Sequence, residues 1–359
     1  MLYNVEVHYK LRGVITMKRL VAAIISLTVL TGGICSCSNA EEDIEQTEDT
    51  SSPSITEVQV DSDVQILYRY ASAEEGVELM MANTEYYDGF SQNDLDYKLA
   101  KSGATMEEYL EFARAQVLDF DEDEIAKIDN CFRRIEDIIS ENGYELPPID
   151  EIILIKTTMD EEPGAGAYTH GTEIYLGDGF IDVIDEERLT VLLCHEMFHC
   201  LTRCNPEFRE EMYSLINFTV VDHDFELPES VFEYHISNPD VEHHNSYATF
   251  IIHGQEIDCF TDFVTTMHYD ESQSDFFSCG TTALIPIDGS DMYYTPDEAE
   301  NFYDVFGMNT GYVIDPEECM ADNFSYAMVY GMDGFGGEGY QNPEIIEGIL
   351  TYLGASFVG

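Results

Sequence analysis

Tryptophan is absent from the 359-residue sequence, and basic side chains are scarce. Only 15 lysines and arginines stand against 72 aspartates and glutamates, which gives a formal net charge of -57. A surface of this charge repels phosphate backbones and anionic lipids, so we expect neither nucleic-acid binding nor electrostatic docking to a membrane. We interpret the charge mainly as a means of keeping an exported protein soluble, with steering of basic substrates as the alternative. The 23 tyrosines and 20 phenylalanines supply aromatic bulk for a core.

The sequence also lacks a hydrophobic run long enough to cross a membrane. The apolar stretch at residues 20–30 is too short for a stable spanning helix. It follows the basic pair Lys18-Arg19 and precedes a small-residue exit, an order that is typical of an export signal. Residues 1–16 do not fit this order, so we expect that they are an upstream mis-start and that the protein begins at Met17.

Ile34-Cys35-Ser36-Cys37 resembles the lipobox of bacterial lipoproteins, with an aliphatic residue three before the second cysteine and a small residue just before it. The resemblance implies a signal peptide at residues 17–36 and a lipid on Cys37. This lipid would hold the protein on the bacterial cell surface or another extracytoplasmic membrane face, and we expect no other membrane contact. An ordinary cleaved signal or a signal-anchor is the alternative. Residues 37–62 are rich in acidic and hydroxyl side chains and predict a solvated tether.

A regular cysteine pattern is missing as well. Two of the nine cysteines belong to the signal, and the other seven have no spacing that indicates a disulfide framework. Cys200 and Cys204 could supply thiolates to a structural metal, but an ideal helix turns Cys200 about 100° away from His199. Buried small side chains are therefore the preferred interpretation of these cysteines.

Residues 63–359 show no internal repeat and no second linker, and we expect a single domain. Isoleucines at helical spacing between residues 124 and 142, followed by Gly143, predict an amphipathic helix and its end. The β-rich run at residues 151–158 predicts a strand. Helices and antiparallel strands mix without a βαβ order, which indicates the α+β class. The other expected elements are a helix at residues 105–120, a strand at 169–176, a helix capped by Asp185, hairpins within 218–267, and helices at 316–330 and 343–353.

His195-Glu196-Met197-Phe198-His199 lies in the helix that Asp185 is expected to cap. Histidines four residues apart project from one helix face and can bind a single tetrahedral Zn²⁺. Glu196 beside them can accept a proton from activated water and pass it to a leaving amine. Two histidines of ordinary structural role are the alternative, but the apolar helix and the preceding strand favour a zinc site.

A catalytic zinc needs a third protein ligand and an open position. Thr202 and Asn205 stand where the metzincin motif has a glycine and a third histidine, so a third histidine ligand of the metzincin type is excluded. Downstream, Pro316 begins a predicted helix on which Glu318 and Asp322 share one face. Glu318 can ligate the metal, and Asp322 can accept the second ring N–H of a ligating histidine.

This pair belongs to the pattern Glu-x-x-Ala-Asp-x-Phe, which runs from Glu318 to Phe324 and is preceded by Tyr312. Together with the His-Glu-x-x-His helix, it resembles the zincins whose third ligand is a helical glutamate, particularly the catalytic domain of anthrax lethal factor. The resemblance implies a zincin-like fold with a mixed sheet, an active-site helix and a downstream glutamate-bearing helix. It also implies the residue roles: His195, His199 and Glu318 bind zinc, Asp322 supports a ligand, and Tyr312 stabilises the oxyanion.

A second acidic pair leaves the identity of the third ligand open. Asp258 and Asp262 are also four residues apart and have Tyr247 upstream. The β-branched residues that alternate around them favour a strand, which would place both on one sheet face rather than on a helix. Glu318 is therefore the preferred ligand, and Asp258 is the alternative.

These residues predict a zinc-dependent endopeptidase with Glu196 as general base and Glu196 and Tyr312 as catalytic residues. The substrate would be an extended peptide or protein that pairs with the strand at residues 169–176, and we expect a monomer. Two other classes remain open. One is a surface lipoprotein binding module with a vestigial or structural zinc site, and the other is a zinc hydrolase of a non-peptide amide with a different third ligand.

Overall fold

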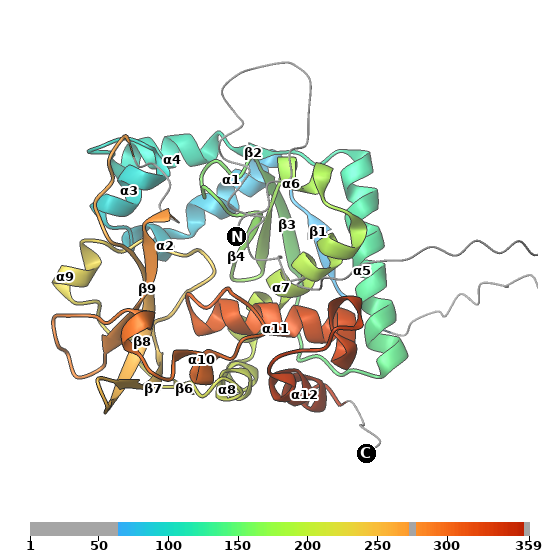
Figure 1. Cartoon of the computed structure of the whole chain (residues 1–359). Coiled ribbons are helices and arrows are strands. Elements are labelled where there is room, and N and C mark those ends of the chain that lie inside the picture. The colour runs from blue at the N-terminus through green and yellow to red at the C-terminus, as the bar shows by residue number, and fades with distance from the viewer. Residues whose placement is uncertain (1–63, 273–277, 355–359) are drawn as a thin grey trace, which may run out of the picture.

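The computed structural model describes residues 64–272 and 278–354 (Figure 1). The expected mis-start, the signal peptide, Cys37 and the acidic tether all lie outside these residues. Within the described part, no helix combines the length and the apolar character that a membrane crossing requires.

A five-stranded mixed sheet lies between two layers of helices. Its strands follow the order β1-β3-β5-β4, and β2 pairs with β3. The β1 and β5 strands run parallel to β3, whereas β2 is antiparallel to β3 and β4 is antiparallel to β5. One edge of the sheet is therefore the antiparallel strand β4. The strands are β1 (Tyr68–Tyr70), β2 (Val117–Leu118), β3 (Ile152–Thr157), β4 (Ala167–His170) and β5 (Glu173–Gly177).

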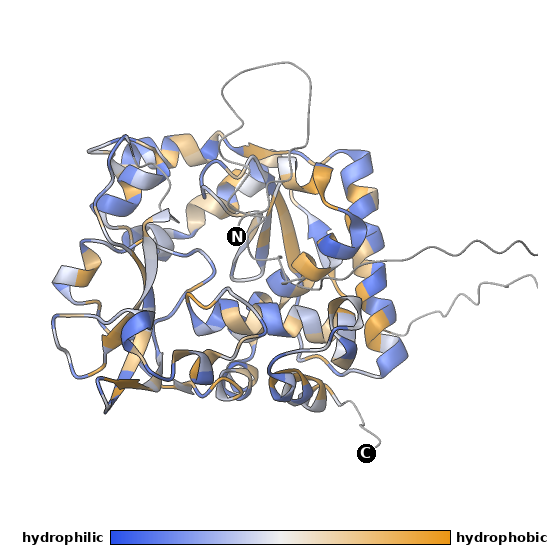
Figure 2. Cartoon of the chain, viewed as in Figure 1, coloured by the Kyte–Doolittle hydropathy of each residue, from blue (hydrophilic) through white to orange (hydrophobic). Residues whose placement is uncertain are grey.

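Side chains along β3 alternate between the two faces of this sheet, as the strand period requires. Leu154 joins the larger hydrophobic core, which also contains α5, α7, α11 and α12. Ile155 joins a second core with the four N-terminal helices. Figure 2 shows the central strands as largely hydrophobic, whereas α5 alternates between hydrophobic and hydrophilic residues. The larger core is covered by α5 (Glu122–Asn142), α6 (Asp178–Val183), α7 (Glu186–Cys204), α8 (Pro206–Ser214), α11 (Pro316–Tyr330) and α12 (Pro343–Tyr352).

The N-terminal helices lie close against the opposite face of the sheet. A side chain on Gly76 would meet the methyl groups of Ile155 and Val117 at 2.9 Å, so glycine permits this approach. These helices are α1 (Ala73–Ala82), α2 (Thr84–Asp88), α3 (Gln92–Lys98) and α4 (Met106–Arg114).

A second, antiparallel sheet follows the α7–α8 region, with strand order β6-β7-β8-β9. Figure 1 shows it on the side of the molecule away from α5 and α12. Its strands are β6 (Thr219–Val220), β7 (Ser246–Ile252), β8 (Gln255–Thr265) and β9 (Gly280–Pro286), with the short helices α9 (Glu229–Phe232), η3 (Pro296–Glu298) and α10 (Phe302–Phe306) beside them. The short 3-10 turns η4 (Gly331–Asp333) and η5 (Phe335–Gly337) occupy the glycine-rich segment after α11.

The α+β class and the mixed sheet are confirmed, and several predicted elements agree closely with the structure. Helix α5 begins after Asp121, whose carboxylate accepts hydrogen bonds from the amides of Asp123 and Glu124, and ends at Gly143 with a φ of 66°. The predicted helix at residues 316–330 has the same bounds as α11.

Two predicted elements are wrong in extent or type. The helix expected at residues 105–120 ends at Arg114, because the chain then forms β2 against β3. The strand expected at residues 169–176 is a hairpin of β4 and β5. Gly171, at the centre of the supposed strand, has a φ of 57° and makes the turn.

Candidate metal centre

Helix α7 carries the two histidines of the predicted motif. Asp185 precedes it, and the Asp185 carboxylate accepts a hydrogen bond from the Arg188 amide, as expected for the cap. His195 and His199 lie one turn apart with ring centroids 4.9 Å from each other, and both are buried. The helix therefore presents two imidazoles side by side in the protein interior.

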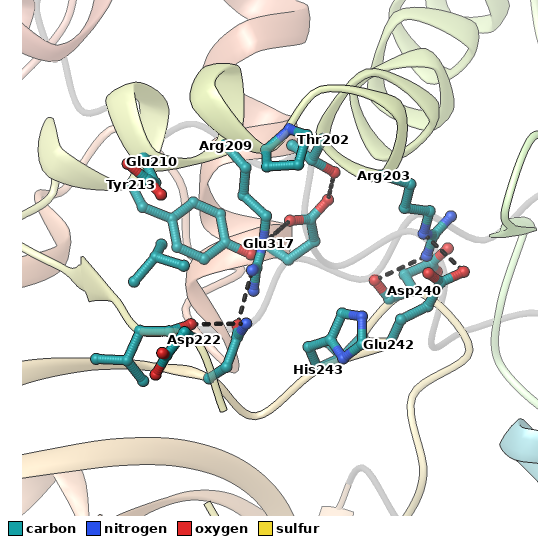
Figure 3. A pocket seen from close by; sticks show the side chains of 15 residues that line it. Thr202, Arg203, Arg209, Glu210, Tyr213, Asp222, Asp240, Glu242, His243 and Glu317 are labelled. Atoms are coloured by element: carbon teal, nitrogen blue, oxygen red, sulfur yellow. Dashed lines mark hydrogen bonds and ion pairs between the residues drawn. The ribbon is translucent and has the colours of Figure 1, made fainter. Parts of the chain in front are cut away.

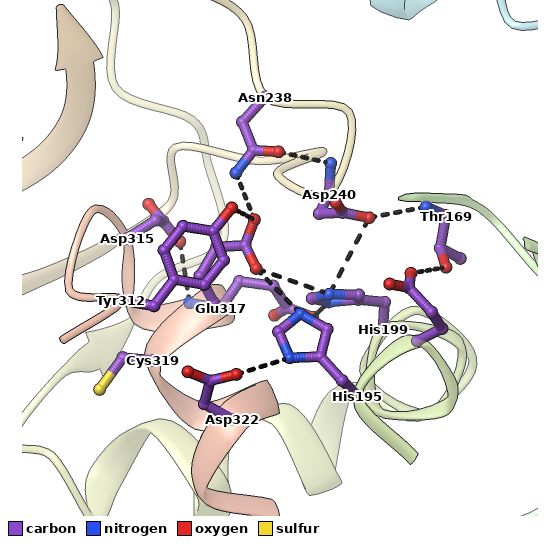
Figure 4. Close-up of polar contacts among 12 residues, drawn as sticks. Thr169, His195, His199, Asn238, Asp240, Tyr312, Asp315, Glu317, Cys319 and Asp322 are labelled. Atoms are coloured by element: carbon purple, nitrogen blue, oxygen red, sulfur yellow. Dashed lines mark hydrogen bonds and ion pairs between the residues drawn. The ribbon is translucent and has the colours of Figure 1, made fainter. Parts of the chain in front are cut away.

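Helix α11 brings Glu318 to these imidazoles, and Figure 4 shows Glu317 and Asp322 of the same helix beside the two histidines. Asp315 caps the helix by accepting a hydrogen bond from the Glu317 amide, and Pro316 stands at its first position. The Glu318 carboxylate is fully buried, and its Oε2 lies 3.1 Å from Nε2 of His195 and 3.8 Å from Nε2 of His199. The preferred third ligand thus lies with both histidines.

The remaining ring nitrogens of the two histidines contact carboxylates on α11. Nδ1 of His195 lies 3.0 Å from Asp322, the contact expected for Asp322. Nδ1 of His199 lies 3.0 Å from Oε1 of Glu317, a residue that the sequence analysis did not single out. When Nδ1–H donates to a carboxylate, the lone pair is on Nε2, which is the atom that faces Glu318.

Glu317 is itself held by a group of polar side chains. The hydroxyl of Thr202 donates to Oε1 at 2.6 Å, and the hydroxyl of Tyr213 donates to Oε2. Nε of Arg209 lies 3.9 Å from Oε2. These residues border a cavity of about 320 Å³ next to the histidines, which Figure 3 shows with Glu317 and Asp240 in its wall.

Glu196 lies on the sheet side of α7, next to the edge strand. The Thr169 hydroxyl on β4 donates to Oε2 of Glu196 at 2.7 Å. Burial raises the pKa of the Glu196 carboxyl above its ordinary value, against the opposing charges of the two histidines. The predicted general base is thus buried between the metal-ligand candidates and a strand that has a free edge in the sheet order.

Tyr312 also lies at the centre, in contact with the candidate ligand Glu318. Its hydroxyl donates to Oε1 of Glu318 at 3.1 Å, and its ring stacks near that of His195 with 6.3 Å between centroids. The side-chain amide of Asn238 donates to the same carboxylate oxygen at 2.6 Å. One oxygen of Glu318 is therefore held by two donors, and the other faces the histidines.

The donor set fits a metal ion. His195, His199 and Glu318 each offer one ligand atom, and these atoms lie within 4.8 Å of one another. Nε2 of His199 is buried and has no hydrogen-bond partner in the described part of the chain. A buried polar nitrogen without a partner is costly, whereas coordination would satisfy it. Two imidazoles and one carboxylate are a ligand set that catalytic zinc uses.

The charges of the centre also favour a cation. Burial alone would lower the pKa of His195, but its hydrogen bonds to Asp322 and Glu318 raise the pKa well above its ordinary value. Burial alone would raise the pKa of Glu318, but the hydrogen bond from His195 and the charge of His199 bring it down to about 2. Positive charge between the Nε2 atoms and Glu318 is thus strongly stabilised by the surrounding carboxylates.

Asp240 forms a second possible ligand group with Glu196 and His199. Its Oδ1 lies 3.9 Å from Nε2 of His199. Burial and the charges of Glu196 and Glu318 raise the pKa of the Asp240 carboxyl well above its ordinary value. The sequence analysis did not single out this residue, because a proline-containing loop gives no signal of a contact with the histidines.

The rival ligand pair lies elsewhere. Asp258 and Asp262 are on strand β8, as their β-branched surroundings predict. Asp258 is exposed and accepts a hydrogen bond from Thr249, while the buried Asp262 contacts His235 and His244. In the described part of the chain, Cys194 and Cys200 are buried, Cys204 is exposed, and none of these three forms a disulfide. The sequence does not indicate that His235 and His244 meet at Asp262, because their proximity depends on the loop between them.

The fold and the centre define a buried site of two histidines and a glutamate beside a second buried glutamate, Glu196. Comparison of the chain with known protein families, with curated proteins and with solved structures gives no match. The geometry and the sequence motifs are therefore the basis of the function proposed below.

Proposed function

We propose that the protein is a zinc-dependent endopeptidase with a zincin-like fold, in which His195, His199 and Glu318 bind zinc. The observation that carries the proposal is the meeting of the two Nε2 atoms with the Glu318 carboxylate, where one nitrogen has no hydrogen-bond partner. Residues 195 and 318 are separated by 123 positions in the sequence. Their contact is thus a product of the fold and not of local sequence spacing.

Zinc in this centre would supply Lewis acidity, which polarises a peptide carbonyl and makes water more acidic. Glu196 moves the proton, because it stands beside the ligand candidates and can accept a proton from water and return it to the leaving amine. The Thr169 hydroxyl fixes the orientation of the Glu196 carboxylate. Tyr312 would donate to the oxygen of the attacked carbonyl after its hydroxyl turns away from Glu318.

The edge strand β4 supports an extended peptide as the substrate. Because β4 pairs with β5 on one side only, its other side can form main-chain hydrogen bonds with an added strand. Thr169 on this strand contacts Glu196, so a peptide paired along β4 would pass beside the general base.

The test measures zinc by elemental analysis and casein cleavage on the same purified samples. We expect Glu318→Ala to lose zinc and cleavage together, and Glu196→Gln to keep zinc and lose cleavage. Asp258→Ala, which removes the exposed rival carboxylate, should keep both. If the protein holds no zinc, or holds zinc but cuts casein neither as the parent nor with Asp240 and Glu242 replaced by alanine, the binding-module class replaces the peptidase.

The site of action remains a proposal from the sequence. We propose that a lipid on Cys37 anchors the protein on the outer side of a bacterial membrane. Expression in a bacterium with labelled palmitate tests this directly. Label should appear in the membrane-bound protein and disappear in Cys37→Ala, and an unlabelled, soluble parent protein would contradict the proposal.

A further inference from the structure

Two main-chain amides at the edge strand β4 and the turn after it are already occupied by carboxylates of this chain. The Thr169 amide on β4 donates to Oδ1 of Asp240 at 2.7 Å, and the amide of Gly171, which makes the turn, donates to Oε1 of Glu242 at 2.8 Å. Two donors that an added substrate strand could use are thus taken by acidic side chains.

The same short segment, residues 238–242, also reaches the metal centre. The Asn238 amide group donates to Oε1 of Glu318 at 2.6 Å. Oδ1 of Asp240 lies 3.9 Å from Nε2 of His199 and belongs to a group with Glu196 and His199. Figure 4 shows Asn238 and Asp240 above the two histidines, with Thr169 beside them. The 238–242 segment therefore spans the space between the ligand candidates and the strand edge.

One arginine of the active-site helix holds this segment in place. Nη2 of Arg203 on α7 donates to the carbonyl oxygen of Asp240 at 3.1 Å, and its Nε lies 3.0 Å from Oε1 of Glu242. The ends of the loop are joined as well, because His235 and His244 both contact the Asp262 carboxylate. The segment is thus the tip of a loop that is closed at its base.

We propose that the 238–242 segment is a built-in occupant of the substrate-binding edge, which keeps the peptidase latent until the segment moves aside. The inference rests on the proposed function, because it concerns regulation of the same centre. A rigid wall of a cleft would contact substrate side chains and leave the strand amides free. Here the segment instead satisfies those amides and places a carboxylate beside His199, where the reacting part of a substrate would lie.

The contacts that hold the segment are reversible. They are hydrogen bonds and ion pairs, and the Glu242 side chain is about one-third exposed (35%). Activity is then limited to the fraction of molecules in which the segment has left the edge. Weakening the closed state raises that fraction without altering the catalytic groups.

The test compares the full-length protein with Asp240→Ala/Glu242→Ala, with Glu242→Ala alone, and with Asp222→Ala/Glu226→Ala. The last variant removes the same charge from exposed positions of a neighbouring loop and serves as the control. Zinc content and casein cleavage are measured on each sample. Amide hydrogen exchange at Thr169 and Gly171, and the binding of fluorescein-labelled casein, are measured on the metal-free proteins.

We expect kcat/KM for casein to rise by about tenfold or more in the double loop variant, by less in Glu242→Ala, and not at all in the control. Zinc content should stay unchanged in Glu242→Ala and in the control, both of which keep the Asp240 carboxylate. Thr169 and Gly171 should exchange faster in the double variant, and labelled casein should bind more tightly and restore their protection. Equal cleavage rates in parent and loop variants, with zinc bound in both, would overturn the latency proposal and leave the peptidase intact.

Failure of the proposed function gives a different result. If no sample holds zinc or cuts casein, the peptidase proposal is wrong. The measurements on the metal-free proteins then decide whether the 238–242 segment occupies the β4 edge. Faster exchange and tighter casein binding in the double variant would still support an occupied edge. Unchanged exchange and binding would overturn it.

Discussion

Glu317→Gln tests whether the residue behind His199 helps to hold the metal. The Glu317 carboxylate accepts hydrogen bonds from the Thr202 and Tyr213 hydroxyls and lies 3.0 Å from Nδ1 of His199. Glutamine has the same shape, but its amide nitrogen cannot accept a hydrogen bond, so one of these donors loses its partner. The loss of a hydrogen bond to a charged group costs about 1.5–3 kcal/mol.

That cost agrees with what metal sites show when the partner of a histidine ligand is changed. Such changes lower metal affinity by about 10- to 100-fold, which is about 1.4–2.8 kcal/mol. We therefore expect Glu317→Gln to bind zinc 10- to 100-fold more weakly than the parent protein, as an order of magnitude. Chelator competition measures this affinity, and far-UV circular dichroism reports on the fold.

The matched control is Glu210→Gln. Glu210 is exposed and lines the same cavity, so it tests the removal of a nearby charge without a change at His199. Its zinc affinity should equal that of the parent protein. A folded Glu317→Gln variant that binds zinc within about twofold of the parent would refute the reasoning, because His199 would then not depend on Glu317.

Tyr312→Phe should keep zinc, because Glu318 retains its other contacts, and should lose about 10²-fold or more in kcat if the hydroxyl stabilises the oxyanion; equal kcat would exclude that role. Phe198→Ala should destabilise the protein by about 3–5 kcal/mol in urea unfolding, because this ring is fully buried in the main core. Asp262→Asn should destabilise the protein in a pH-dependent way. Burial alone would lower the pKa of His244, but the hydrogen bond to Asp262 and the charge of Asp262 raise it above its ordinary value. The stabilisation that protonated His244 gains from Asp262 is therefore complete below about pH 6.5 and is lost as pH rises through the higher pKa of the folded state. The stability gap between the parent and Asp262→Asn should therefore be larger at about pH 6 than at about pH 9, and a gap that widens with pH would contradict the assignment.

Much of the candidate site could be predicted because its key spacings are local. His195 and His199 share a helix face whatever the rest of the chain does, provided that the helix forms. Asp185 and Pro316 mark the starts of α7 and α11 through capping preferences that act within one turn. Glu318 could be preferred to Asp258 for the same reason. Pro316 predicts a helix that places Glu318 and Asp322 on one face, whereas the residues around Asp258 predict a strand.

The residues that sequence reasoning missed are those whose partners lie far along the chain. Thr169 meets Glu196 only because β4 is the edge strand beside α7, and Asp240 meets Thr169 across 71 residues. No local period encodes such contacts. The hairpin error at residues 169–176 has a different cause, because β-rich residues flank Gly171 on both sides and the glycine was treated as part of one strand rather than as a turn.

Glu317 is the one missed residue whose position the sequence could have indicated. The contacts pair His195 with Asp322 and His199 with Glu317, so the chain advances on α7 while it goes back on α11. The two helices therefore run antiparallel at the centre. Glu317 and Asp322 are about 1.4 turns apart on α11, lie on either side of Glu318, and meet the two histidines in reverse order. A shift of α11 by one residue would break both Nδ1 contacts at once, so the support of the two histidines and the placement of Glu318 are properties of a single helix register.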